Sequence, residues 1–357
     1  MRAVLEVVSP GAMASIQDLG RHGLRRVGVP TAGALEPGWL RLANALAGNE
    51  QDAPAIEFLG GGLSLRALEH PVRIALAGYF RAEVVAAGGR RRLDSWRSVT
   101  LAPGEPLRCA QLTAGRVAYL ALAGMRVPPQ LGSASTYARA GLGGVDGGLL
   151  LAGVRFLAGG CSGDEKGLPA PPLADPAPIR VVLGPQDDYF EPASIACLLS
   201  AAYQVSPAAD RMGMRLDGPL LRHRREKGVE ITSDATVPGS IQVPAQGQPI
   251  VLLADGQTAG GYAKIATVIS ADLPRLGVMA PGQVLHFRSV SVAVAEQAAR
   301  QREAAVQALL AAIAPLVERS GIDLQAIYAA NLVSGVVDAQ AMDDAFALAD
   351  PPGKEEQ

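Results

Sequence analysis

Frequent glycine and proline residues restrict what this chain can fold into more than any other feature of its sequence. The 357 residues include 41 Gly and 26 Pro, well above the roughly 12% that average usage gives for the two residues together. Both residues interrupt helices and strands and favour turns. Turns must therefore be frequent, and the elements between them must be short.

Short apolar segments rich in β-branched residues lie between these turns. They span 72–77, 99–102, 116–123, 179–183, 229–232, 250–254, 265–269 and 284–292. Their length, their β-branched residues and their glycine and proline flanks favour strands over helices. The first 290 residues are therefore predicted to be mainly β.

Three segments instead show the pattern of helices. Residues 36–47 carry apolar side chains at helical spacing and end at Gly48, and residues 191–202 form a second, short candidate. The third spans 293–318, where an apolar stripe follows an otherwise polar helix and Pro315 is expected to kink or end it. Strands do not alternate with helices along the chain, which argues against a doubly wound parallel sheet.

One proline-rich stretch divides the predicted strands into two groups. Residues 163–178 contain five prolines and no apolar periodicity, and a predicted strand follows at once. Such a stretch is typical of a surface linker or a long crossover. We therefore expect a first β domain over 1–163, a linker over 164–178, a second β domain over 179–290, and a helical extension with a disordered tail over 291–357.

The charge balance excludes several classes of protein. The 32 Lys and Arg residues nearly match the 34 Asp and Glu residues, for a formal net charge of -2, so no basic field points to nucleic acid or a membrane surface. The longest apolar stretches fall short of the roughly 20 residues that span a bilayer. The first residues lack the apolar core of a signal peptide, and we expect a cytoplasmic protein.

Cysteine and histidine residues are few and scattered. Cys109, Cys161 and Cys197 are widely spaced and odd in number, which fits neither a disulfide scaffold nor a zinc site, and we expect reduced structural thiols. No two of the four histidines have metal-ligand spacing, so no metal site is predicted. The chain also has no P-loop motif of its own.

The most informative stretch surrounds a predicted strand at 250–254. Because this run is continuously apolar, it is typical of a strand buried on both faces, and it places Asp255 at the rim of a core. Glycines follow at 256, 260 and 261, where backbone can approach a ligand closely. Polar side chains that could contact such a ligand are Gln242, Gln257, Thr258, Tyr262 and Lys264.

Two interpretations of this stretch remain open. Lys264 begins a predicted strand beside small and apolar neighbours, where it would be either a paired cation or a base of lowered pKa. Alternatively, the stretch is a tight glycine-rich turn in which Asp255 caps backbone amides and Lys264 extends to water. The convergence of several polar groups on glycines favours a binding site.

Two further clusters contain arginines. Gln17, Asp18 and Arg21 near the start could bind a small polar molecule, or Asp18 and Arg21 could form a self-satisfied salt-bridged corner. Arg211 and Arg215 lie four residues apart, and guanidinium groups suit carboxylate or phosphate ligands. A network of Asp and Arg residues that holds two loops together is the alternative for this second cluster.

These motifs together resemble the allophanate hydrolase subunit 2 family. The resemblance rests on Ser15-Ile16-Gln17-Asp18-Leu19-Gly20-Arg21, Gly184-Pro185-Gln186, Asp210-Arg211-Met212-Gly213-Met214-Arg215-Leu216, Gly239-Ser240-Ile241-Gln242-Val243-Pro244 and Asp255-Gly256-Gln257-Thr258-Ala259-Gly260-Gly261-Tyr262. It covers residues 1–290 in order. The family includes the C subunit of bacterial ATP-dependent 5-oxoprolinase, the antagonist of the kinase inhibitor KipI, and a segment of urea carboxylase.

The resemblance implies a fold and an assembly. It implies two cyclophilin-like β-barrel domains with a helical C-terminal extension, a B-type partner that resembles allophanate hydrolase subunit 1, and an A-type oxoprolinase subunit. Such a complex opens 5-oxoproline to glutamate with ATP, and we expect that this chain alone does not bind the ATP. No biotinyl-lysine motif is present, so the chain is not a self-contained biotin enzyme.

The chemistry of a lactam suggests roles for several of the candidate residues. Backbone amides at Gly260 and Gly261, with Gln242 and Gln257, would bind the carbonyl as it gains charge. Either of two arginines, Arg211 and Arg215, would hold the ring carboxylate. The candidates for proton transfer are Asp255, Tyr262 and Lys264.

Two other functions are compatible with the same family. The chain could be a non-catalytic antagonist of a KipI-type inhibitor of a histidine kinase. It could also be a carboxyltransferase component related to urea carboxylase. The sequence favours the oxoprolinase function, with a small-molecule substrate.

Overall fold

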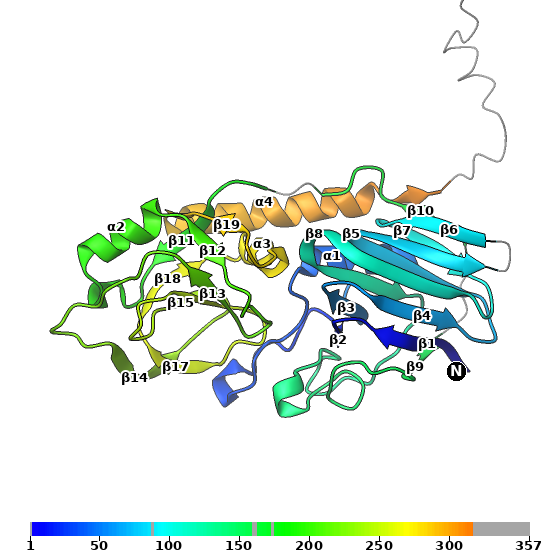
Figure 1. The fold of residues 1–357 in the computed structure, drawn as a ribbon, viewed down its shortest axis with the longest axis horizontal. Coiled ribbons are helices and arrows are strands. Elements are labelled where there is room, and N and C mark those ends of the chain that lie inside the picture. The colour runs from blue at the N-terminus through cyan, green and yellow to red at the C-terminus, as the bar shows by residue number, and fades with distance from the viewer. Residues whose placement is uncertain (1, 87–88, 159–162, 173–174, 317–357) are drawn as a thin grey trace, which may run out of the picture. The chain divides into compact units, whose positions relative to one another are not determined.

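The computed structural model describes residues 2–86, 89–158, 163–172 and 175–316 (Figure 1). The described part is mainly β, as predicted, and residues 1–316 group as one compact unit. The predicted disordered tail lies outside the described residues.

An eleven-stranded antiparallel sheet forms the first part of the structure. Its strands are β1 (Arg2–Pro10), β2 (Met13–Gln17), β3 (Ala55–Leu59), β4 (Leu63–Ala67), β5 (Val72–Ala86), β6 (Gly89–Asp94), β7 (Arg97–Leu101), β8 (Pro106–Leu122), β9 (Arg155–Ala158), β10 (Lys166–Gly167) and β21 (Ala314–Pro315). The long strand β8 pairs with β4 near its start and with β3 near its end, while β5 runs along both parts. One long strand thus pairs with two shorter strands, one after the other along its length.

The β5–β8 ladder is irregular near the middle of β5. The register shifts between Ala77 and Tyr79, at Gly78, whose φ is +131°. A Cβ atom at Gly78 would lie 2.7 Å from the Cβ of Ala118. Glycine is needed here because the two backbones approach too closely for any side chain.

A second sheet of eight strands follows in the sequence. Its strands are β11 (Ile179–Leu183), β12 (Tyr203–Val205), β13 (Gly213–Asp217), β15 (Ser240–Gln242), β16 (Ile250–Leu252), β18 (Lys264–Val268), β19 (Val284–Leu285) and β20 (Phe287–Ser289). All pairs are antiparallel except β11 with β20. A separate ribbon pairs β14 (Glu230–Ala235) with β17 (Ala259–Tyr262).

Four α-helices accompany the sheets in the described residues. The predicted helix at 36–47 is α1 (Pro37–Ala47), with the Glu36 side chain accepting from the Gly38 amide at its start and Gly48 at its end. The predicted helix at 191–202 is α2 (Pro192–Ser200). The short helix α3 (Leu273–Val278) was not predicted, because six residues are too few to establish a helical pattern.

The helix predicted at 293–318 is α4 (Val292–Ala311), and its predicted end was wrong. The residue before a proline is disfavoured in the helical conformation, and Ala314 precedes Pro315. Both residues are extended in β21, which pairs with β10. The chain thus leaves the helix before the proline and returns to the first sheet.

The proline-rich segment predicted as a linker contributes to the first sheet. Within it, β10 pairs with β7 and β21, and Leu168 is 6% exposed.

One apolar cluster joins the two sheets. It combines α1 residues such as Leu42 with residues of the second sheet such as Val251. A second cluster fills the first sheet alone, around Phe58 and Leu120.

Within the described ranges, no helix is long and apolar enough to cross a bilayer. Cys109 is buried and Cys197 half-buried, and neither forms a disulfide. Cys161 lies outside the described residues. Burial raises the pKa of Cys109, which is consistent with an inert structural thiol.

Candidate functional site

A closed loop at residues 18–34 brings two of the predicted clusters together. The amide of Ala34 donates to the Asp18 carbonyl at 2.9 Å, and the amide of Arg21 donates to the Thr31 carbonyl at 2.7 Å. The loop contains the short 3-10 helix η1 (Arg25–Val27). Its Ala32 amide donates to the Ala254 carbonyl at 3.0 Å. The loop therefore contacts the strand end that carries Asp255.

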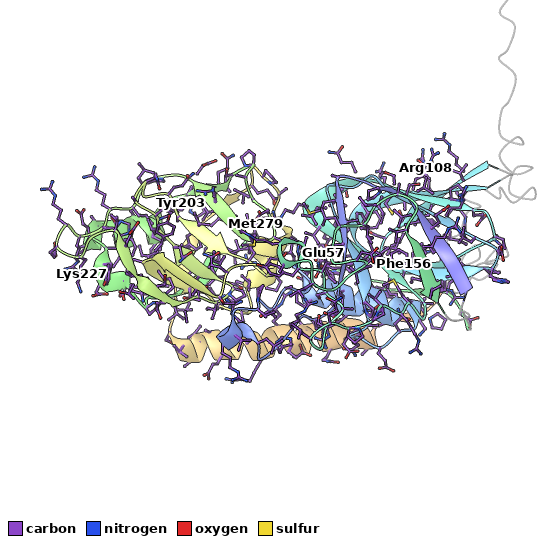
Figure 2. The ribbon with its side chains drawn as sticks, turned by 90° about the horizontal axis from the view of Figure 1, so that it is seen from below. Glu57, Arg108, Phe156, Tyr203, Lys227 and Met279 are labelled. Carbon is purple, nitrogen blue, oxygen red and sulfur yellow. The ribbon has the colours of Figure 1, made fainter. Side chains whose placement is uncertain are left out.

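A buried arginine links the two sheets beneath this loop. Arg211 donates to both oxygens of Asp255, at 3.0 and 2.9 Å, to the Gly33 carbonyl at 2.6 Å, and to Glu57 on β3. Glu57 is fully buried and also accepts from the Tyr119 hydroxyl at 2.6 Å. In Figure 2, Glu57 lies near the middle of the molecule, where the two sheets meet.

One guanidinium group in this network faces two carboxylates. Burial by itself lowers the pKa of Arg211, but the carboxylates of Glu57 and Asp255 raise it by more, so the guanidinium stays charged. Burial raises the pKa of Asp255 against the opposing effect of Arg211. This arrangement matches the alternative of a network that holds two loops together. It leaves Arg211 committed to protein acceptors.

The second arginine of that motif lies elsewhere. Arg215 is exposed on β13, where Met214 and Leu216 on either side are buried. Strand alternation thus points Arg215 away from the core that holds its neighbours. The two arginines do not converge on one ligand.

The Asp18 carboxylate binds the segment 133–135 and not the Arg21 side chain. Its carboxylate accepts from the Gly20 amide, from the Ala134 amide, and from the hydroxyls of Ser133 and Ser135, at 2.5 to 2.7 Å. The salt-bridged corner with Arg21 is not formed. Asp18 instead fixes the 133–135 segment against the loop.

Arg21 and Gln17 are buried beside that segment. Arg21 is 1% exposed and donates to the carbonyls of Gln130 at 3.1 Å and Ser133 at 3.4 Å. Gln17 is fully buried and donates to the Ser15 hydroxyl at 2.9 Å and to the Thr136 carbonyl at 3.3 Å. Burial lowers the pKa of Arg21, although Asp18 and Asp255 act in the opposite direction.

Arg25 joins the site without having been predicted. Its Nη2 donates to the carbonyls of Thr236 at 2.7 Å and Gln257 at 3.0 Å. The sequence offers no local signal for this contact, because the partners lie more than 200 residues away. Only the folded loop carries Arg25 to the second sheet.

Two glutamines and a glycine form the part of the site next to Arg25. The Gln257 side chain donates to Gln242 Oε1 at 2.9 Å, and Gln242 is 2% exposed. A Cβ atom at Gly260 would lie 2.6 Å from Gln242 Nε2. The glycines of this stretch were expected to let a ligand approach the backbone closely. At Gly260 the group that approaches the backbone is the Gln242 side chain. Thr258 lies half-buried in the same turn, and its carbonyl accepts from the Thr236 amide at 3.0 Å.

Lys264 is the paired cation of the two predicted alternatives. It begins β18, is 2% exposed, and donates through Nζ to Asp234 Oδ2 at 2.8 Å. The hydrogen bond from Lys264 is the main cause that lowers the pKa of Asp234. Tyr262 is 40% exposed on β17, beside Gly261.

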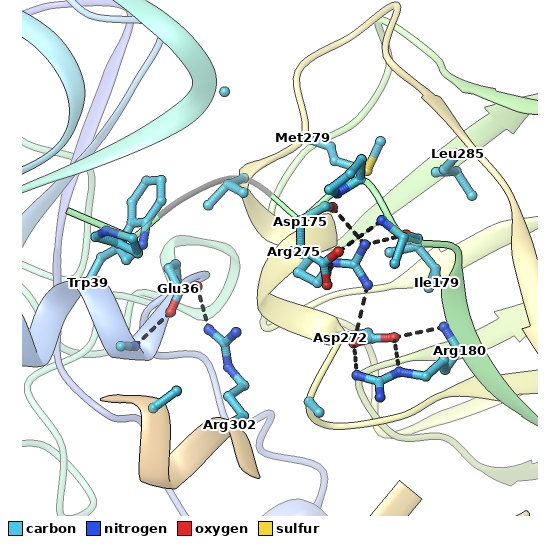
Figure 3. Close-up of a pocket in the computed structure, with 18 of the residues that line it drawn as sticks. Glu36, Trp39, Asp175, Ile179, Arg180, Asp272, Arg275, Met279, Leu285 and Arg302 are labelled. Carbon is cyan, nitrogen blue, oxygen red and sulfur yellow. Dashed lines mark hydrogen bonds and ion pairs between the residues drawn. The ribbon is translucent and has the colours of Figure 1, made fainter. Parts of the chain in front are cut away.

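A cavity of about 750 Å³ lies apart from all of these residues, between α1, α3, β11 and α4 (Figure 3). Its apolar lining includes Trp39 and Met279. Two groups of ion pairs also line it: Arg302 with Glu36, and Asp272 with Arg180 and Arg275. The long C-terminal helix therefore closes a groove within the chain. None of the residues predicted from the sequence lines this cavity.

No group of three or more His, Cys, Asp or Glu side chains in the described ranges is placed to hold a metal ion. The candidate site thus consists of hydrogen-bonding groups and charged side chains. Such a site can bind and polarise a small polar molecule and move protons.

The fold is that of carboxyltransferase-type domains, and the chain belongs to the family described as "Carboxyltransferase domain, subdomain A and B", whose model matches residues 27–289. It is 36% identical to the C subunit of 5-oxoprolinase from Escherichia coli, over 84% of this chain and 94% of that protein. It is 35% identical to the C subunit of 5-oxoprolinase from Haemophilus influenzae, over 84% and 96% respectively.

A solved structure shares the fold. The crystal structure of the Kluyveromyces lactis urea carboxylase matches with a TM-score of 0.76 and 28% sequence identity. The match covers 86% of this chain and 29% of that one. The sequence resemblance to this family is thereby confirmed.

Proposed function

We propose that this chain is the C subunit of an ATP-dependent 5-oxoprolinase complex, which hydrolyses 5-oxoproline to glutamate. The observation that carries the proposal is the similarity to the C subunits of two 5-oxoprolinases over 94% and 96% of their lengths. Similarity over nearly the whole length supports the same place in an assembly. In this proposal the complex also contains a B-type and an A-type subunit.

The site contains candidates for two of the tasks in lactam opening, polarising the ring carbonyl and transferring a proton. Hydrolysis of 5-oxoproline requires a polarised ring carbonyl, a bound carboxylate and a proton for the leaving nitrogen. Donors for the carbonyl are the side-chain amides of Gln242 and Gln257 and the backbone amides of Gly260 and Gly261. These groups are neutral and partly withdrawn from water, which strengthens their effect on a developing oxyanion.

The three candidates for proton transfer differ in whether they already form an ion pair within the protein. Asp255 is held by Arg211, and Lys264 is held by Asp234. Tyr262 is 40% exposed on β17. We therefore assign proton transfer first to Tyr262, with Asp255 and Lys264 as positioning groups.

In this proposal, the complex consumes ATP, and the ATP is bound by another subunit and not by this chain.

The test is reconstitution of the complex. This chain is coexpressed with the B-type and A-type subunits, and ATP-dependent release of glutamate from 5-oxoproline is measured with each subunit omitted in turn. Activity that disappears without this chain supports the proposal. A soluble complex of all three subunits that releases no glutamate would overturn it.

A carboxyltransferase component is the second candidate, because the matching family is a carboxyltransferase domain and a urea carboxylase shares the fold. The chain has no biotinyl-lysine motif, so a separate carrier would have to deliver the carboxyl group. Transfer of a labelled carboxyl group from such a carrier to urea, by a complex that releases no glutamate from 5-oxoproline, would favour this function.

A further inference from the structure

The cavity between α1, α3, β11 and α4 is large for a space within one compact unit. Its volume is about 750 Å³, whereas the interiors of folded proteins contain few spaces larger than a water molecule. Clefts of roughly 300 to 1,000 Å³ are typical of sites that bind small molecules. None of the residues of the candidate site lines this cavity, so a molecule bound here would occupy a second site.

Much of the cavity lining is apolar. Trp39 on α1 packs edge-on against Tyr79, which also lines the cavity, and against Trp96, with ring centroids 5.5 and 5.3 Å apart. Leu285 on β19 and Val306 on α4 are 4% and 8% exposed and add aliphatic surface. Because the aromatic rings hold one another in place, this lining offers a fixed apolar surface to a ligand.

The carboxylates of the lining already have partners. Glu36 accepts from a backbone amide of α1 at 2.7 Å and from Arg302 at 2.5 Å, one bond to each oxygen. Asp272 accepts from Arg180 at both oxygens, at 2.7 to 2.9 Å. The side chain of Asp175 is 51% exposed and is also paired. A cationic ligand would therefore find no unpaired carboxylate among the described residues of this lining.

Arg302, in contrast, has N–H groups without an acceptor. A guanidinium group has five N–H donors. Arg302 uses Nη2 in its pair with Glu36, and within the described ranges its Nε and Nη1 form no hydrogen bond. These two nitrogen atoms are not buried, and the side chain is 30% exposed. Arg302 thus has donors for a second partner.

The Arg302 guanidinium lies at the start of α1, beside the aromatic part of the lining. A Cβ atom at Gly38 would lie 3.8 Å from Arg302 Nη2, and Gly38 directly precedes Trp39. Figure 3 shows Arg302 extending from α4 toward Glu36. Charged donors and apolar surface therefore adjoin in one cavity.

We propose that this cavity binds an organic acid with an apolar body. Its carboxylate accepts charge-assisted hydrogen bonds from Arg302, and its apolar body packs on the lining around Trp39. One guanidinium already pairs with two carboxylates elsewhere in this chain, where Arg211 contacts Glu57 and Asp255. The site does not depend on which reaction the complex catalyses.

Tryptophan fluorescence reports on this cavity. The chain has two tryptophans, Trp39 and Trp96, whose rings pack together. The full chain is titrated with three probes that share one aliphatic chain length: octanoate, octanamide and octylamine. Octanoate should change the emission in a saturable way. Octanamide should bind at least about 10-fold more weakly because its head group is uncharged, and octylamine should be the weakest.

Arg302→Gln tests the contact with the carboxylate, and Arg300→Gln is the matched control. Arg300 is 72% exposed on the same helix, pairs with the exposed Glu296, and does not line the cavity. Arg302→Gln should weaken octanoate binding about 10-fold or more, since a hydrogen bond to a charged group is lost. It should leave the affinity for octanamide nearly unchanged. Arg300→Gln should alter neither affinity.

Ala305→Phe tests the location of the site without removing a charge. Ala305 lines the cavity from α4, whereas its neighbour Ala304 is exposed and does not line it. A phenyl group at position 305 reduces the space for a ligand, so the affinities for octanoate and octanamide should fall together. Ala304→Phe should leave both unchanged. Thermal unfolding checks that each variant is folded, and Ala305→Phe decides the location if Arg302→Gln does not fold.

Three results would overturn the site or part of it. Octanoate that binds no more tightly than octylamine to the wild-type chain rejects the preference for an acid. An octanoate affinity that neither Arg302→Gln nor Ala305→Phe lowers places the ligand outside this cavity. A loss in Ala305→Phe alone, with a folded Arg302→Gln variant unchanged, rejects the role of Arg302.

Discussion

Arg211 and Asp255 face each other in two parallel hydrogen bonds of 3.0 and 2.9 Å at the contact between the two sheets. Both side chains are buried. The pair is joined to the first sheet through Glu57, which is 154 residues from Arg211 in the sequence. An aspartate that the sequence marks as a candidate acid or base is therefore also part of the connection between the sheets.

Asp255→Asn should lower the free energy of unfolding by about 3 kcal/mol, because it leaves a buried guanidinium without one of its two counterions. The change is measured by denaturant unfolding of the isolated chain. Asp188→Asn is the matched control, since Asp188 pairs with Lys227 where both side chains are exposed. That variant should lose less than about 1 kcal/mol. Equal losses in the two variants would refute a structural role for the buried pair.

Lys264→Met should raise the pKa of Asp234 toward its ordinary value. Asp234 has a lowered pKa in the folded protein, first because of the hydrogen bond from Lys264. Carbon-13 NMR titration of the Asp234 carboxyl group measures the change. Gln186→Leu removes a weaker hydrogen bond at 3.1 Å and should raise the pKa by less. No change in Lys264→Met would show that the ion pair between Lys264 and Asp234 is not formed in solution.

Asp272→Asn should reduce stability at neutral pH and flatten its acid dependence. Asp272 is fully buried and, despite the opposing effect of burial, its pKa is lowered by Arg180 and Arg275. A carboxyl group with a lowered folded-state pKa stabilises the protein above its unfolded pKa, near 3.8, and this contribution disappears as the pH falls through the folded value. The expected loss at pH 7 is about 3 kcal/mol.

The measurement is the free energy of unfolding between about pH 2.5 and pH 7. Asp175→Asn is the control, because Asp175 also pairs with Arg275 but its side chain is 51% exposed. It should change stability by less than about 1 kcal/mol. If Asp272→Asn retains the acid dependence of the wild type, the stabilising pairs of Asp272 do not operate in solution.

Gly277→Ala should destabilise the protein although alanine is the better helix former. A Cβ atom at Gly277 in α3 would lie 2.5 Å from the Leu35 carbonyl oxygen. The helix propensity gain of about 1 kcal/mol is smaller than the expected cost of overpacking, so a net loss of about 1–2 kcal/mol is expected. Thermal unfolding measures the result.

Gly148→Ala provides the comparison for that substitution. A Cβ atom at Gly148 would meet nothing within 4 Å, so this variant should be neutral or slightly stabilising. A stabilised Gly277→Ala variant would show that α3 and the segment before α1 are farther apart in solution than in the structure.

Local patterns predicted three of the four described helices and the strands that carry continuous apolar runs, because each of these elements depends on a few neighbouring residues. The apolar run at 179–183 is β11, and the pattern at 36–47 is α1. The sequence did not predict β10 within the proline-rich segment, since a two-residue strand has no periodicity and exists only by pairing with β7 and β21. The assignment of the candidate site residues to roles stays a prediction.

The sequence by itself determined the family, the mainly β architecture and the segments that carry polar groups on glycine-rich turns, because these follow from local patterns. Tertiary structure decided which charges are neutralised. Arg211 and Arg21 look alike in the sequence, each close to an aspartate, yet Arg211 meets two carboxylates and Arg21 meets only carbonyls. Partners of this kind come from distant segments, and only the packing of the two sheets brings them within hydrogen-bonding distance.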